Sequence, residues 1–341
     1  MSTKKRFQEL DSLRGIAVIL VVLFHLTMKR KETNLEFNLG VTGVDLFFLI
    51  SGFVIYFSLT NIKTSKEFIV NRFSRLFPTY WFCVSFTYLL ILILSITSYK
   101  INHISVSQYL ANMTMLQYYF KCKNIDGSYW TMLIELIFYI GILSIFYIKS
   151  IKNIKIIGTI LTILVLILTI FSGYTYARNI LLLIPFLEFT PLFFAGILFY
   201  KIYSEKNKKL ENYFLLFMCY LSQIILFKYS VRSVGIISLQ EYMLMQAIYF
   251  SLFILFVNGK LKFIISKPFL FLGKISFPLY LIHQKISNYF ILPLLVNKFH
   301  INFWIASLLI CLPIVICLAT LITNYIEIPI GRKIKEKLSA N

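Results

Sequence analysis

Long apolar stretches alternate with short polar segments along almost the whole chain. Each apolar stretch is close to the length of about 20 residues that an α-helix needs to cross a bilayer. They fall at about residues 13–28, 41–60, 79–98, 129–148, 154–172, 180–200, 212–228, 242–258, 276–296 and 303–326. The pattern predicts an all-α fold, a polytopic transmembrane bundle of about ten helices. Because no internal repeat or linker interrupts it, we expect a single domain over residues 1–341.

The composition supports this interpretation. The chain is 59% hydrophobic and 14% charged, and its mean hydropathy is +0.79. Soluble domains carry about 45–50% apolar and about 25% charged residues. This composition excludes a water-soluble globular protein. Any activity must therefore take place in or beside the helix bundle.

The net charge of +20 is better explained by membrane topology than by nucleic-acid binding. Lys and Arg are enriched in alternate loops, and cytoplasmic loops hold such an excess. Both termini are therefore expected on the cytoplasmic side. The first stretch resembles a signal peptide, but Lys29-Arg30-Lys31 follows it and no small-residue cleavage site is present, so we expect a retained span. In the longest outer loop, 99–128, the segment Gln108–Tyr119 is a candidate interfacial helix.

A few ionisable residues lie inside the apolar stretches. Burying such a group in a bilayer costs at least a few kcal/mol, so each one is a candidate for a functional site. They are His25, Asp45, Glu135, Glu188, His283, Lys285 and Glu327, with Arg14 at the cytoplasmic end of the first stretch.

His25 and Asp45 are expected at the same depth, each about one turn below the outer surface. At 1.5 Å per residue, His25 lies roughly 16 Å deeper than Arg14 on one helix. A carboxylate beside the imidazole would fix its tautomer and raise its basicity, as a general base acting on a hydroxyl requires. Alternatively, His25 only joins two helices by a hydrogen bond, and Asp45 caps the second span.

Arg72 and Arg75 precede the third stretch on the cytoplasmic side. Two arginines three residues apart form a forked donor surface suited to phosphate groups. A cytosolic phosphorylated donor could bind there. The alternative is a positively charged topological anchor beside an aromatic belt.

Other chemistries have little support in the sequence. No Walker A or GxGxxG motif opens a helix, which argues against an ATPase or a dinucleotide enzyme. The intramembrane histidines occur without metal-ligand spacing, and the five cysteines contain no CxxC pair, so we expect neither a metal site nor a disulfide framework.

Taken in order, six segments of the chain resemble the acyltransferase-3 family of bacterial membrane O-acyltransferases. The resemblance covers nearly the whole chain. It is to the members of the family that lack an additional SGNH-type extracytoplasmic domain. The segments are Leu10-Asp11-Ser12-Leu13-Arg14-Gly15-Ile16-Ala17 with His25, the stretch 43–53, the stretch 68–81 with Arg72 and Arg75, the stretch 128–135, Ser276 with Leu279-Tyr280-Leu281-Ile282-His283, and Glu327-Ile328-Pro329.

The resemblance implies a ten-helix protein of the bacterial cytoplasmic membrane. It implies transfer of an acyl group, usually acetyl, from cytosolic acetyl-CoA to a sugar hydroxyl of a cell-surface or exported glycan, completed by the bundle or by a separate extracytoplasmic partner. Carried over, His25 matches the essential histidine, Arg14 its partner, and Arg72 and Arg75 the CoA-phosphate contacts. Further residues matching the pattern are Ser128, Trp130, Glu135, Tyr280 and His283.

Two other classes remain open from the sequence. A glycan transporter or flippase would also bury polar groups in a helix bundle, although no inverted repeat is visible. A structural membrane subunit would not need an Arg, a His and an Asp in its first two spans. Exchange or hydrolysis of acetyl-CoA by the purified protein separates the enzyme from both.

Overall fold

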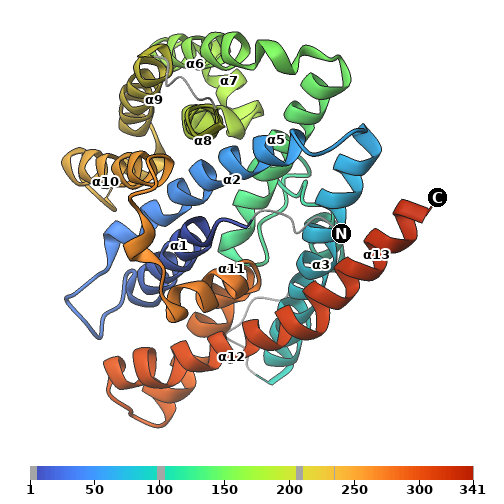
Figure 1. Ribbon diagram of the computed structural model, residues 1–341. Coiled ribbons are helices and arrows are strands. Elements are labelled where there is room, and N and C mark those ends of the chain that lie inside the picture. The colour runs from blue at the N-terminus through green and yellow to red at the C-terminus, as the bar shows by residue number, and fades with distance from the viewer. Residues whose placement is uncertain (1–5, 98–103, 205–209, 234, 341) are drawn as a thin grey trace. The chain divides into compact units, whose positions relative to one another are not determined.

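The computed structural model describes residues 6–97, 104–204, 210–233 and 235–340. Within these ranges all regular structure is helical, as predicted (Figure 1). The helices are α1 (Gln8–Thr27), α2 (Gly43–Leu59), α3 (Ser65–Thr97), α4 (Val106–Met113), α5 (Trp130–Tyr147), α6 (Ile154–Ile170), α7 (Thr175–Leu183), α8 (Thr190–Ser204), α9 (Leu210–Lys228), α10 (Leu239–Val257), α11 (Lys267–Lys285), α12 (Leu312–Ile322) and α13 (Ile328–Ala340).

Shorter helical elements join them. The segments η7 (Ile286–Ile291), η8 (Pro293–Lys298), η9 (Ile305–Cys311) and η10 (Thr323–Glu327) are π-helical. The 3-10 turns are η1 (Asn38–Thr42), η2 (Gly127–Tyr129), η3 (Ser150–Asn153), η4 (Pro185–Phe189), η5 (Val231–Ser233) and η6 (Lys262–Ile264). Wide π-helical turns are rare and concentrate at functional sites. The π-helical run that begins directly after α11 therefore makes this part of the chain a candidate for a functional site.

Among the described residues, nine helical segments are long and apolar enough to cross a membrane. They coincide with nine of the ten predicted spans. The remaining one, 276–296, falls on α11 and η7, where the polar run His283-Gln284-Lys285 lowers the hydropathy. The third span also begins earlier than predicted, because α3 continues through its basic first turns and through Pro78. The helix predicted within Gln108–Tyr119 is present but shorter and earlier, as α4.

The chain forms two compact units. The first comprises Met1–Val21, Asn38–Lys63 and Ile137–Gly273. Its centre is α8, which is buried along almost its whole length and packs between α2 on one side and α6 and α9 on the other. A β-carbon at Gly52 would meet the Phe193 carbonyl, and one at Gly196 would meet the Leu49 carbonyl. Glycine at these two positions therefore permits the close contact of α2 with α8.

The second unit comprises Val22–Phe37, Thr64–Leu136 and Lys274–Asn341. In it α13 packs along α3, and Gly331 lies close to the Ser74 carbonyl. Helix α1 passes from one unit into the other, because its first 14 residues, Gln8–Val21, belong to the first unit and its last turns to the second. The second unit therefore contains both the C-terminal turns of α1 and the C-terminal turns of α11.

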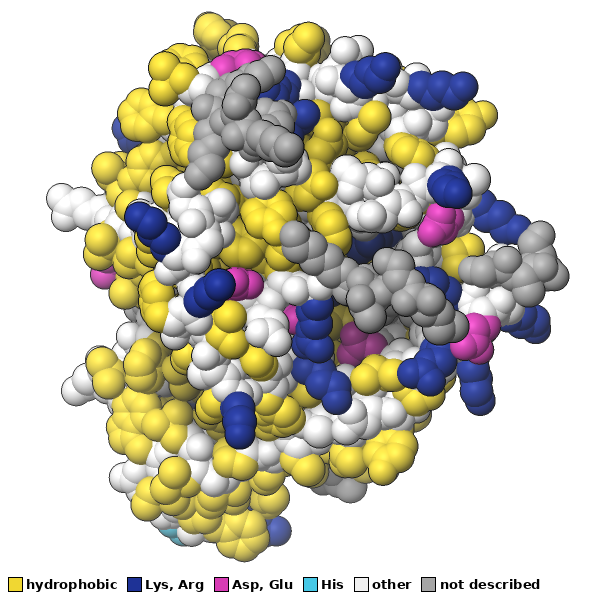
Figure 2. All heavy atoms as spheres, viewed as in Figure 1, with side chains coloured by type: hydrophobic (Ala, Val, Ile, Leu, Met, Phe, Trp, Pro, Cys, Tyr) yellow, Lys and Arg dark blue, Asp and Glu magenta, His cyan; other side chains and the backbone are white. Residues whose placement is uncertain are grey.

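The exterior is apolar, as expected of a membrane protein. Hydrophobic side chains cover much of the face shown in Figure 2. On α6 a row of large aliphatic side chains is exposed, namely Ile156, Ile160, Ile163, Leu164, Ile167 and Ile170. Exposure of so many aliphatic groups is costly in water and favourable against lipid. The arrangement supports a multi-pass protein.

Candidate active site

Two histidines from distant parts of the sequence meet in the second unit. His25 lies on the last turn of α1 and is partly exposed, whereas His283, near the end of α11, is buried. The Nδ1 atom of His25 lies 3.0 Å from Nε2 of His283. On its other side, Nδ1 of His283 lies 2.8 Å from the backbone oxygen of Tyr280.

The partners of the two rings define their tautomers. A backbone carbonyl only accepts, so Nδ1 of His283 carries the proton and donates to Tyr280. In a neutral ring Nε2 is then an acceptor, and His25 donates to it from Nδ1. The Nε2 atom of His25 therefore keeps its lone pair. This is the atom with which a neutral imidazole acts as a general base.

The backbone around His25 is held by two further side chains. Asn288 Nδ2 donates to the His25 carbonyl at 2.9 Å, and Arg30 Nη2 donates to Asn288 Oδ1 at 2.6 Å. Arg30 Nε also donates to the carbonyl of Leu26 at 3.2 Å. Carbonyls in the last turn of a helix lack intrahelical partners. Arg30 and Asn288 satisfy two of them and fix the end of α1 against η7.

The loop before α5 brings a buried carboxylate to the end of α11. Asn112 organises this loop: it donates to the Lys123 carbonyl and accepts from the Ile125 amide, both at 3.0 Å. Asp126 follows, fully buried. Its Oδ2 accepts from the backbone amide of Lys285 at 2.8 Å. Burial raises the pKa of Asp126, and the hydrogen bonds from Ser128 and Lys285 oppose that rise.

Several residues of the predicted site lie in the same unit. Ser128 and Tyr280 are buried, and Thr131 joins them, because its Oγ1 lies 3.1 Å from the Tyr280 hydroxyl and 3.1 Å from the Ser128 carbonyl. Trp130 and Glu135 stand on α5 and are partly buried. The structure thus connects the start of α5 with α11 beside His283. The roles of these residues stay predictions.

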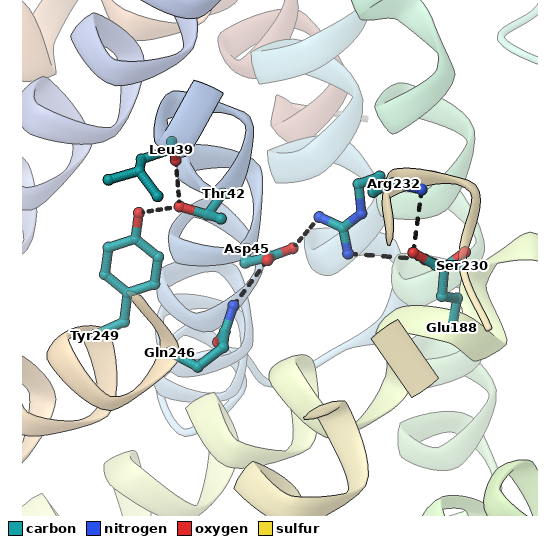
Figure 3. A network of polar contacts seen from close by, with 8 residues as sticks. All are labelled: Leu39, Thr42, Asp45, Glu188, Ser230, Arg232, Gln246 and Tyr249. Atoms are coloured by element: carbon teal, nitrogen blue, oxygen red, sulfur yellow. Dashed lines mark hydrogen bonds and ion pairs between the residues drawn. The ribbon is translucent and has the colours of Figure 1, made fainter. Parts of the chain in front are cut away.

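Asp45 belongs to a polar network of the first unit (Figure 3). It is completely buried, its Oδ1 accepts from Arg232 Nη1 at 2.7 Å and its Oδ2 from Gln246 Nε2 at 2.8 Å. Arg232 also lies 3.7 Å from Glu188 and stacks over the Phe189 ring, 4.9 Å from its centroid.

The positive charge of Arg232 is stabilised by its surroundings. Burial lowers the pKa of its guanidinium, but the neighbouring charges, Asp45 first and Glu188 among the rest, raise it above its usual value. The guanidinium therefore stays protonated at any physiological pH, and a buried ion pair ties the start of α2 to the connection between α9 and α10.

The expected pairing of Asp45 with His25 stays a prediction, because Asp45 belongs to the first unit and His25 to the second. Within the first unit the Asp45 oxygens accept from Arg232 and Gln246, and within the second unit His25 lies against His283. The alternative role at the start of the second span holds in part: Asp45 stands in the first turn of α2, where a negative charge favours the helix dipole, while its oxygens accept from side chains of other elements.

The predicted arginines belong to different units, Arg14 to the first and Arg72 with Arg75 to the second. Arg14, on the part of α1 that belongs to the first unit, contacts Asp11, with Nη1 3.5 Å from Oδ1. Arg72 and Arg75 lie one turn apart on α3 in the second unit; Arg72 is partly buried over the Phe68 ring, and Arg75 is exposed. An exposed arginine beside a half-buried one is a geometry that can bind an anion from solution.

Comparison with known families supplies the chemistry for this site. The model of the family described as an acyltransferase domain matches residues 7–323, nearly the whole chain. The match includes both histidines, the Arg72 and Arg75 pair and the loop around Asp126. The chain belongs to the acyltransferase-3 family. Membership makes the protein an O-acyltransferase, and the roles of His25 and His283 in that reaction stay predictions.

Two curated relatives match over short segments. One is the exopolysaccharide production protein ExoZ of Rhizobium meliloti, 43% identical over 61 residues, which are 18% of this chain and 18% of ExoZ. The other is the peptidoglycan O-acetyltransferase OatA of Listeria monocytogenes, 34% identical over 86 residues, which are 22% of this chain and 12% of OatA. The matches thus cover less than a fifth of either relative. No solved structure matches the chain.

Two charged residues of this acyltransferase-3 protein were missed by the sequence interpretation. Arg232 and Asp126 both lie in connections between spans, where charged side chains are normally solvated, and both are largely buried. The turn residues Asn124 to Ser128 around Asp126 indicated a loop, but no local signal showed that its carboxylate turns inward. Long-range packing decides these contacts.

Proposed function

We propose that the protein is a membrane O-acyltransferase that moves an acyl group, acetyl in the first instance, from cytosolic acyl-CoA to a sugar hydroxyl of a cell-surface or exported glycan. The family match supports the reaction class. One observation carries the mechanism: the tautomers of the histidine pair leave Nε2 of His25 unprotonated on a partly exposed ring.

In this proposal His25 is the general base. Its Nε2 removes the proton of the sugar hydroxyl while the sugar oxygen attacks the thioester carbonyl, and the imidazolium then returns the proton to the departing CoA sulfur. A carbon–oxygen bond forms, a carbon–sulfur bond breaks, and the proton ends on the thiol. His283 accepts from Nδ1 of His25 throughout and keeps Nε2 directed at the reacting hydroxyl.

The acceptor class rests on the relatives. ExoZ is named for exopolysaccharide production and OatA for O-acetylation of peptidoglycan. Both names concern polymers of sugars outside the cytoplasm. A glycan hydroxyl is therefore the acceptor that we propose, with the donor reaching the site from the cytoplasmic side.

The test is release of free CoA thiol by the purified protein in liposomes that contain acetyl-CoA. An acyltransferase liberates thiol, in the presence of a sugar acceptor or slowly to water, and the acetyl group appears on the acceptor. A transporter or flippase would leave the thioester intact. Wild-type protein that binds a glycan but releases no thiol above the rate of empty liposomes would contradict the proposed function.

Arg72 and Arg75 are expected to bind the phosphates of the donor. Each charge-assisted contact is worth on the order of 1.5–3 kcal/mol, so the double variant Arg72→Ala/Arg75→Ala should bind acetyl-CoA at least tenfold more weakly. The dependence of affinity on salt should become flatter, because fewer charges meet the phosphates.

The matched control for that variant is Lys260→Ala/Lys262→Ala, two exposed cations in the connection between α10 and α11 of the first unit. It removes the same formal charge away from α3 and α13 and should leave affinity and salt dependence unchanged. Equal affinity and equal salt dependence in the wild type and the Arg72/Arg75 variant would mean that these arginines are topological anchors.

A further inference from the structure

Asp126 is a buried carboxylate with an unusually complete set of donors. It has no exposed surface. Its Oδ1 accepts from the Ser128 amide at 2.9 Å and from the Ser128 hydroxyl at 2.8 Å, and its Oδ2 accepts from the Lys285 amide at 2.8 Å. Three donors and no acceptor suit the ionised form, because a protonated carboxyl would need a group to receive its hydrogen.

The Lys285 amide lies where helix α11 changes its geometry. Lys285 is the last residue of α11 and precedes the π-helical segment η7. It follows His283 by two residues, and His283 holds Nδ1 of His25. By fixing this amide, Asp126 fixes the end of α11 on which His283 stands. A side chain bonded to the helix backbone at such a junction is a common cause of the altered geometry.

The negative charge of Asp126 also acts on His25. Among the described residues, the titratable groups that interact electrostatically with Asp126 include His25, Tyr80, Cys83, Tyr129 and Tyr280. The cations Lys285 and Arg30 stand on the elements that contact Asp126 and His25. The tyrosines and the cysteine are neutral at neutral pH. His25, coupled to His283, is therefore the neighbour whose charge changes during general-base catalysis, when it becomes an imidazolium.

We propose that Asp126 is a positioning residue of the transfer reaction: its buried negative charge stabilises the imidazolium form of His25, and its bond to the Lys285 amide holds His283 in register behind it. The role rests on the proposed function of His25. The usual carboxylate–histidine arrangement, in which the acid bonds the ring directly, is here divided between His283, which holds the ring, and Asp126, which supplies the charge.

The test is Asp126→Asn, which keeps the shape and an acceptor oxygen but removes the charge. Without the charge, His25 remains neutral to lower pH. The acid limb of the kcat-against-pH profile should therefore move down by about one pH unit, and the maximal kcat should fall about tenfold. Both effects have the same cause, the loss of the attraction between the Asp126 carboxylate and the His25 imidazolium. The KM for acetyl-CoA should stay near that of the wild type.

The matched control is Glu32→Gln, which removes one negative charge from an exposed position in the same unit, seven residues after His25. It should move neither the acid limb nor kcat. A purely structural Asp126 would lower the yield of folded protein or its melting temperature and leave the pH profile in place, and that result would overturn the proposal.

A second measurement does not depend on catalysis. Diethyl pyrocarbonate modifies neutral imidazole, so the rate of His25 labelling against pH, followed by mass spectrometry, reports its protonation. Asp126→Asn should move the labelling midpoint down by about one pH unit, and an unchanged midpoint would overturn the proposal. Should wild-type protein show no acyl transfer, the proposed function fails, and the labelling still decides the role of Asp126. If Asp126→Asn does not fold, the pair Asp126→Glu and Asp126→Gln gives the same comparison of charge.

Discussion

His25→Ala is expected to lower acyl transfer by about 10²–10⁴-fold, the usual contribution of a positioned base. The structure gives the reason, since the hydrogen bonds of His283 to Tyr280 and of His25 to His283 place the proton of a neutral His25 ring on Nδ1 and leave Nε2 as its basic atom. The amount of folded protein should be nearly unchanged, because the ring is partly exposed and its removal leaves a small cavity. The measurement is the rate of acetyl transfer per mole of monodisperse protein.

His300→Asn serves as the control for that variant. His300 is exposed and has a φ of +56°, a left-handed conformation that asparagine tolerates better than alanine. It should retain full activity. A His25→Ala protein that keeps more than about a tenth of wild-type transfer would contradict the assignment, since a positioned base is worth far more.

The fold could be predicted because its cause is local. Twenty consecutive apolar residues suffice to define a span, and nine predicted spans coincide with helices of that kind in the described residues. The exception is α11, where polar residues of the candidate site interrupt the apolar pattern. In this span the polar residues that lower the hydropathy include a candidate site residue, His283, so the same feature weakens the signal for a span and suggests a site.

The partners of the site residues could not be predicted, because they depend on packing between distant segments. His25 and His283 were both identified as intramembrane histidines, yet 258 residues separate them. The equal depth expected for His25 and Asp45 favoured a pairing between them. Within the first unit, Arg232, 187 residues beyond Asp45, donates to that carboxylate. No local pattern indicates this contact, because a charge-assisted hydrogen bond between distant segments depends on how the helices pack.

The ion pair of Asp45 with Arg232 carries the second large prediction. Asp45→Asn leaves the guanidinium of Arg232, whose side chain is 11% exposed, with Glu188 as its remaining acid at 3.7 Å. Breaking a buried pair by removing one partner costs roughly 3–5 kcal/mol of the free energy of unfolding. Arg232→Gln should cost a similar amount, because it strands the Asp45 carboxylate. Thermal unfolding of the purified protein in detergent measures both.

The double variant Asp45→Asn/Arg232→Gln separates the pair from its two members. With neither member of the pair left charged, the loss of unfolding free energy in the double variant should be well below the sum of the two single losses, which is the signature of direct coupling. Arg6→Gln is the control, because Arg6 pairs with Asp11 at a side chain that is 64% exposed and such pairs contribute about 0–1 kcal/mol. Additive losses in the double variant would contradict a direct ion pair. A folded Asp45→Asn protein whose activity per mole falls as far as that of His25→Ala would instead return Asp45 to the chemistry of the site, because the ion pair by itself predicts a loss of stability and not of turnover.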